Sequence, residues 1–142
     1  MSVSIFEVSF EKAVCISDIY CSISECLGFS VESVISEDLF WELSSAQQRV
    51  SVGLRVEWAD QGYRTLVVGF CFLDVYGEAL ERLAMCLADR LTTKVAIGDY
   101  VNDVDFSTGR FIVVSPGGGR EFGVEYSNDD FFDIRLISQK ER

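Results

Sequence analysis

The chain has 142 residues, 49% of them hydrophobic, and its 23 acidic against 12 basic residues give a net charge of −11. This length suits one domain over residues 1–142 with its own core. We expect no transmembrane helix, because the sequence has no apolar run of about 18 residues. We also expect no secretory signal, because the N-terminal region is not basic. The acidity disfavours nucleic acid and anionic membranes as partners, and the absence of histidine removes imidazole-dependent nucleophiles and the commonest zinc ligands.

The N-terminal third predicts a strand, a helix and two short segments. Residues 3–10 are rich in β-formers and predict the strand. A helix follows, capped by Ser17 or Asp18 and ended by Gly28, because apolar residues recur at helical spacing at Ile16, Ile19, Tyr20, Ile23 and Leu27. Residues 29–35 suggest a short strand, and residues 36–48 a short helix begun by Ser36.

The middle of the chain predicts a hairpin and a second helix. Residues 50–58 alternate strictly between apolar and polar side chains, residues 59–62 form a turn, and residues 63–73 return with little polarity on either face. The second strand is therefore expected at the centre of the sheet. Asp74 can cap a helix over residues 75–91, whose core stripe is Leu80, Leu83, Ala84, Leu87 and Leu91.

The last third reads as strands separated by polar turns. Residues 94–100 and 110–115 predict two strands, and residues 120–127 and a segment near 132–137 predict two more. Read in order, the elements predict an α+β fold: an antiparallel-rich sheet with two main helices on one face, built as a βαββαβ-like core with a C-terminal β-hairpin extension. A mixed α+β sheet of another topology is the alternative.

The five cysteines are Cys15, Cys21, Cys26, Cys71 and Cys86. Their number is odd, no two are spaced as CxxC, and their neighbours are apolar or small. This pattern favours buried, reduced thiols in a cytoplasmic protein and a fold that needs no disulfide or metal. We expect no cofactor.

Two loops resemble ligand-binding motifs only superficially. The segment SPGGG, residues 115–119, follows a strand as a phosphate-binding loop does, but the residues after it alternate like a strand and no GK[ST] sequence is present. We therefore expect a hairpin turn. Asp103, Asp105 and Ser107 match the start of a calcium loop, but Thr108 and Val114 stand where that loop needs Gly and Glu.

The acidic residues are unevenly distributed, with eight acids against two bases between residues 99 and 133. Carboxylates beside aromatic rings are typical of a protein-binding surface, where rings anchor the partner and charge attracts it. We expect a basic protein partner to bind this segment, with the acids of residues 32–42 as a second candidate patch. The predicted partner-binding residues are Asp99, Asp103, Asp105, Glu121, Glu125, Asp129, Asp130, Phe131 and Asp133.

In size, acidity and strand–helix order, the chain resembles the bacterial immunity proteins that neutralise polymorphic or contact-dependent growth-inhibition toxins. The resemblance rests on no motif, so no residue role is transferred by it. It implies a cytoplasmic, non-catalytic antitoxin, a monomer or small homo-oligomer, that binds a cognate basic toxin, often a nuclease. A small acidic secretion chaperone and a carboxylate-dependent hydrolase are the alternatives. The hydrolase requires a pocket with two acids whose pKa values are pushed apart.

Overall fold

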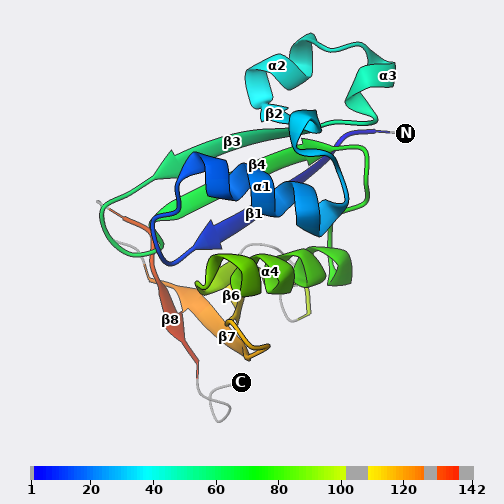
Figure 1. The fold of residues 1–142 in the computed structure, drawn as a ribbon. Helices are drawn as coiled ribbons and strands as arrows, with labels where there is room; N and C mark the ends of the chain where they lie inside the picture. The colour runs from blue at the N-terminus through cyan, green and yellow to red at the C-terminus, as the bar shows by residue number, and fades with distance from the viewer. Residues whose placement is uncertain (1, 102–108, 127–130, 138–142) are drawn as a thin grey trace.

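The computed structural model describes residues 2–101, 109–126 and 131–137 (Figure 1). Over these residues one eight-stranded sheet has the strand order β2-β3-β4-β1-β5-β6-β7-β8. The strands are β1 (Ser4–Phe10), β2 (Val34–Ser36), β3 (Val52–Trp58), β4 (Thr65–Cys71), β5 (Val95–Gly98), β6 (Arg110–Val114), β7 (Arg120–Glu125) and β8 (Ile134–Leu136). The helices are α1 (Ile16–Leu27), the 3-10 turn η1 (Val31–Ser33), α2 (Glu37–Glu42), α3 (Ser45–Gln48) and α4 (Glu78–Leu91).

The predicted fold class is confirmed. The four central strands β3-β4-β1-β5 pair antiparallel throughout, and β4 lies between β1 and β3, the two core strands that precede and follow α1 in the chain. This is the split βαββαβ arrangement. Strand β2 adds to the β3 edge in parallel, while β6, β7 and β8 add in sequence beside β5. The C-terminal extension is thus a hairpin with a third strand.

The two long helices cover one face of the sheet (Figure 1). Alternation along β1 directs Phe6, Val8 and Phe10 to that face, where they join the apolar stripes of α1 and α4 in the main core. Gly69 of β4 permits the closest contact, because a Cβ there would lie 2.0 Å from the ring of Phe6. We call this side of the sheet the helix-covered face.

Only some of the helix ends lie where the sequence predicts them. Gly28 ends α1 with φ 80°, in the left-handed conformation expected of a C-cap. Cys15 rather than Ser17 or Asp18 occupies the N-cap position of α1. The second helix begins at Glu78, not at residue 75, because Gly77 adopts φ 57° and ψ −129°, outside the helical region.

The other side of the sheet is covered by α2 at one corner. Ser36 caps α2 as predicted, accepting a hydrogen bond from the amide of Leu39. Phe40 of α2 is fully buried and packs with Val68 and Phe70 in a cluster separate from the main core. A Cβ at Gly53 would lie 2.6 Å from the Cβ of Phe40, so this glycine sets how closely α2 approaches β3.

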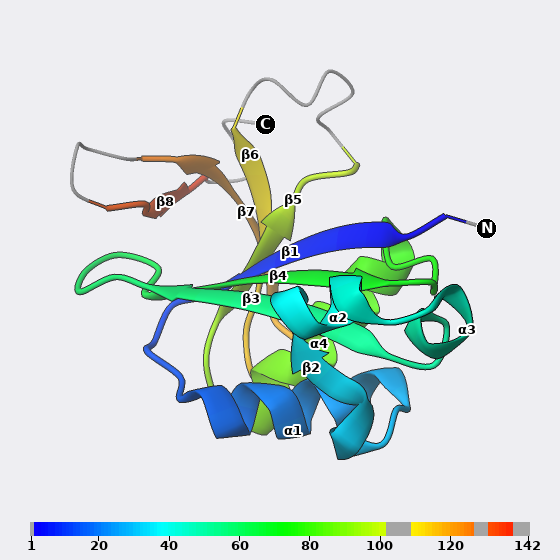
Figure 2. The ribbon, with the colours of Figure 1, turned by 90° about the horizontal axis from the view of Figure 1, so that it is seen from above.

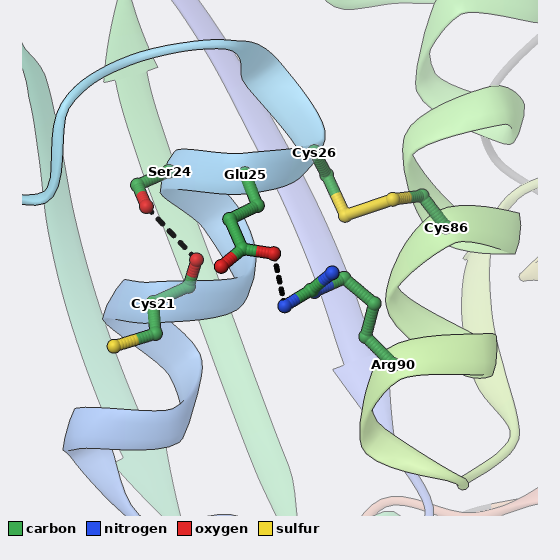
Figure 3. The surroundings of a disulfide bond; sticks show 6 residues. All are labelled: Cys21, Ser24, Glu25, Cys26, Cys86 and Arg90. Atoms are coloured by element: carbon green, nitrogen blue, oxygen red, sulfur yellow. Dashed lines mark hydrogen bonds and ion pairs between the residues drawn. A yellow bond between two sulfur atoms is a disulfide. The ribbon is translucent and has the colours of Figure 1, made fainter.

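The expectation of five reduced, buried cysteines is wrong. Cys26 of α1 and Cys86 of α4 form a disulfide, with their Cα atoms 6.0 Å apart (Figure 3). Cys71 is buried as predicted, whereas Cys15 and Cys21 are exposed. The two bonded cysteines are 60 residues apart, and they meet because α1 and α4 pack side by side. Glu25 and Arg90 form an ion pair between the same helices.

The sheet turns sharply at its middle. In Figure 2, β1, β3 and β4 run across the view, while β5 and β6 run at a steep angle to these three strands. Only two residue pairs join β1 to β5, Ser9 with Ala96 and Phe10 with Val95, against seven between β1 and β4. The sheet therefore has two halves joined at one short seam.

The glycine-rich segment is the predicted hairpin turn between β6 and β7. The amide of Ser115 donates to the carbonyl oxygen of Gly119 at 2.9 Å, and Gly117 and Gly118 have φ values of 89° and 96°. Only glycine adopts such values without strain. The amide of Gly117 also donates to Asp89 of α4 at 2.8 Å, which ties the turn to the helix. Among the described residues, no helix is long and apolar enough to cross a bilayer.

Candidate functional site

The side of the sheet opposite α1 and α4 presents carboxylates at both ends of one row of side chains. The strand registers place Glu57, Leu66, Ser9, Ala96, Val113 and Glu121 in line across β3, β4, β1, β5, β6 and β7. The next row places Glu7 opposite Val68 and Val68 opposite Arg55. The strand positions that point away from the main core therefore share one side of the sheet, where Ala96 and Val113 are buried in a small cluster with Tyr63 and the carboxylates at the two ends stay exposed.

A hollow of about 360 Å³ lies on this surface. Ser9 and Leu66 line it, and Glu7 and Glu57 are exposed beside them. Its lining also includes Trp58, Ala59, Tyr63, Arg64, Phe111 and Phe132. Two carboxylates against one guanidinium leave the lining with a net negative charge.

Three aromatic rings of the hollow pack edge to face. The ring centroids of Phe111 and Phe132 are 5.2 Å apart, and those of Tyr63 and Phe132 are 6.1 Å apart. The amide of Tyr63 donates to the carbonyl oxygen of Phe132 at 2.9 Å. The β3–β4 turn thus holds the segment before β8, and both lie at the same end of the sheet in Figure 2.

Several carboxylates gather around Tyr63. Burial is the largest cause that raises the pKa of its phenol, and the charges of Glu11, Asp133 and Glu121 raise it further. Glu11 directly follows β1, Asp133 lies in the segment before β8, and Glu121 belongs to β7. We call the carboxylates of Glu7, Glu57 and Glu121, with the rings of Tyr63, Phe111 and Phe132, the acidic–aromatic face.

The structure brings some of the predicted partner-binding residues together. Glu121 and Glu125 are exposed on the same side of β7, and Asp133 is half-buried with one carboxylate oxygen accepting from the amide of Ile134 at 2.8 Å. Phe131 is half-buried against the β3–β4 turn, where a Cβ at Gly62 would lie 2.7 Å from its ring. The charges of Glu121 and Asp133 both raise the pKa of the Tyr63 phenol.

Asp99 does not lie on that surface. Its side chain is fully buried, its carboxylate lies 3.8 Å from Nε of Arg110, and it accepts a hydrogen bond from the amide of Val101 at 3.0 Å. This carboxylate is buried and paired within the chain, so it is not presented to a partner. The predicted residues Asp103, Asp105, Asp129 and Asp130 lie outside the described residues. Of the second predicted patch, Glu37 pairs with Arg55 at 3.4 Å and accepts from the indole of Trp41.

A second hollow, beside α4, contains an ion pair. Nε of Arg120 lies 2.6 Å from one oxygen of Glu81, and the Tyr100 hydroxyl donates to the other at 2.7 Å. Burial alone would raise the pKa of Glu81, but the hydrogen bonds from Arg120 and Tyr100 outweigh it, and the net pKa is lowered. A general acid needs the opposite shift. Within the described part of the chain, no three metal-ligating side chains gather.

Glu7, Glu57, Tyr63 and Phe111 are not among the partner-binding residues predicted from the sequence. The signal was present, because Glu7 and Glu57 occupy the polar positions of alternating strands. These positions resembled an ordinary solvent-exposed side, and only strand order shows that they border one hollow with rings from β6 and the β3–β4 turn. No family model, curated protein or solved structure matches this chain.

Proposed function

We propose that the protein is a non-catalytic binding protein whose acidic–aromatic face binds a basic protein, and that the partner is a toxin domain that it neutralises as an immunity protein. The observation that carries the proposal is the hollow between Glu7 and Glu57 with its packed aromatic rings. Exposed carboxylates speed association with a positively charged partner, and partly exposed rings supply the contact area that holds it.

The internal pairing of the other charged groups supports this choice of surface. Glu81 and Asp99 are each occupied by an arginine within the chain. Glu57 lies 3.7 Å from Arg55 but keeps 62% of its side chain exposed, and Glu121 is exposed at the other end of the same row. A basic toxin such as a nuclease carries a positive cleft for phosphates, and the carboxylates on β1, β3 and β7 can enter such a cleft and exclude its substrate.

The test uses the polypeptide encoded next to this gene, produced together with the protein in one cell. Under the proposal the two co-purify, and the protein restores the growth that the neighbouring polypeptide inhibits. The double variant Glu57→Lys/Glu121→Lys is expected to slow association at least tenfold at low salt and to reduce its salt dependence. Glu32→Lys, exposed on η1, is the single-site control. Full protection by the double variant would contradict the proposed surface.

The proposal places the protein in the cytoplasm, where glutathione and thioredoxin keep thiols reduced. The disulfide between Cys26 and Cys86 makes that location testable. Cells are lysed in an alkylating agent, and the modified cysteines are identified by mass spectrometry. A cytoplasmic protein is expected to be alkylated at both residues. An intact Cys26–Cys86 bond in the trapped protein would point to an oxidising compartment instead.

A further inference from the structure

We propose that the hollow of the acidic–aromatic face is a receptor for a single arginine side chain of the partner. This inference rests on the proposed binding function and adds the chemistry of the residue that is recognised. The lining of the hollow combines carboxylates, apolar side chains and aromatic rings around about 360 Å³. An arginine side chain has the matching parts, namely a cationic planar head and an apolar stem.

The charge of the hollow selects a cation. Glu7 and Glu57 line it against Arg64 alone, and the charges of Glu11, Asp133 and Glu121 act on Tyr63 in its wall. Glu57 also lies 3.7 Å from Arg55, but that pair is exposed, with half of the arginine side chain and 62% of the glutamate side chain accessible. Such a surface pair is weak, so Glu57 can exchange Arg55 for an incoming guanidinium.

The rings select arginine over lysine. Phe132 packs edge to face against both Phe111, at 5.2 Å between ring centroids, and Tyr63, at 6.1 Å, and all three residues line the hollow. A guanidinium stacks on an aromatic face and still donates hydrogen bonds in its own plane, whereas a lysine ammonium is a compact and strongly hydrated charge. Arginine is also enriched among residues that dominate the energy of protein interfaces.

The hollow is held in shape before a partner binds. The hydrogen bond from the Tyr63 amide to Phe132 fixes one wall. The close contact of Gly62 with Phe131 and Phe132 fixes the turn beside it, where a Cβ would lie 2.2 Å from the carbonyl oxygen of Phe132. A preformed site loses less conformational entropy when it binds. Recognition of one side chain at this place therefore needs little rearrangement.

The test uses capped Gly-Arg-Gly, Gly-Lys-Gly and Gly-citrulline-Gly peptides, which need no toxin partner. Each is titrated into the protein, and backbone amide shifts are followed by NMR. The arginine peptide is expected to shift the amides of Ser9, Glu57 and Leu66 in a saturable way and to bind at least threefold more tightly than the lysine peptide. Citrulline keeps the shape without the charge and is expected to bind at least tenfold more weakly.

Two variants assign the binding to the hollow. Glu57→Gln and Phe132→Leu are each expected to weaken the arginine peptide about threefold. Glu32→Gln removes the same charge far from the hollow and is expected to change nothing. Equal binding of arginine and citrulline peptides, or shifts centred on α2, would overturn the inference. Failure of the neighbouring polypeptide to bind would overturn the proposed toxin function and leave this result standing, so the two failures are distinguishable.

Discussion

The two faces of the sheet are built from the same strands, and along β1 they have opposite properties. On the helix-covered face, Phe6, Val8 and Phe10 of β1 are almost completely buried. On the other face, the intervening residues Glu7 and Ser9 line a hollow open to solvent. Because side chains alternate along a strand, residues of the main core and residues of the proposed binding surface follow one another at single-residue intervals in β1. Substitutions on the two faces should therefore have separable effects.

The largest effect is expected at the disulfide between α1 and α4. Its two cysteines enclose a long loop, with a sequence separation of 60, and the chain-entropy model gives about 4 kcal/mol for a loop of this length. Reduction, or the double variant Cys26→Ser/Cys86→Ser, is expected to lower the free energy of unfolding by that amount in urea denaturation. Cys15→Ser/Cys21→Ser, at two exposed free cysteines, is the control. Equal midpoints for oxidised and reduced protein would show that the bond does not support the helix-covered face.

The next effect is expected where β4 meets β1 under the helices. Gly69→Ala places a methyl group 2.0 Å from the Phe6 ring and is expected to cost about 3 kcal/mol of stability through overpacking. Gly98→Ala in β5 is the matched control, since nothing lies within 4 Å of a Cβ there. Thermal unfolding followed by circular dichroism measures both. Equal melting temperatures for the two variants would contradict the close packing at Gly69.

A smaller effect is expected for the ion pair between α4 and β7. Glu81→Gln removes the charge that holds Arg120 and Tyr100 and is expected to cost about 2 kcal/mol at pH 7. Because the folded-state pKa of Glu81 lies below its ordinary value of 4.5, its contribution is complete above that pH and is lost as the pH falls through the lowered value. The difference between wild type and variant should thus be constant from pH 5 to 8 and shrink below pH 4.5.

Chemical denaturation of wild type and Glu81→Gln across this pH range measures both the size of their stability difference and the direction in which it changes with pH. Glu78→Gln, exposed one turn earlier on the same helix, is the control and is expected to show no such pH dependence. A difference that grows on acidification would mean that Glu81 is held in the protonated form.

The smallest change in stability is expected on the acidic–aromatic face. Glu7→Gln and Glu57→Gln are expected to alter the free energy of unfolding by less than about 0.5 kcal/mol, as exposed surface positions do. These same substitutions are expected to weaken binding of a basic partner. A loss of several kcal/mol in chemical denaturation would show that the two faces are not separable.

Local signals predicted much of the fold. Gly28 ends a helix because of its left-handed conformation, and the apolar residues 63–73 predicted a central strand, which the structure shows as β4. Both features are determined by neighbouring residues along the chain. The partnering of Cys26 with Cys86 was not predictable, because helix packing alone brings them together.

The candidate site was less predictable than the fold. Asp99 appeared to be one more acid in an acidic segment, and its burial beside Arg110 depends on how β5 meets β6. Glu57 and Glu121 are 64 residues apart in sequence and share a row because four strands lie between them. Charge density along the sequence identifies an acidic protein, but strand order decides which carboxylates share a surface.

The central place of β1 has a consequence for synthesis of the chain. Its neighbours in the sheet are β4 and β5, so the first strand to leave the ribosome finds its partners only when residues 65–71 and 95–96 have followed. At about 5–20 residues per second, β4 is complete roughly 3–12 s after β1, and the pairing residues of β5 follow roughly 4–17 s after β1. Throughout that time the apolar side of β1 has no sheet to join, and during translation α1 is the nearest element along the chain that can shield it.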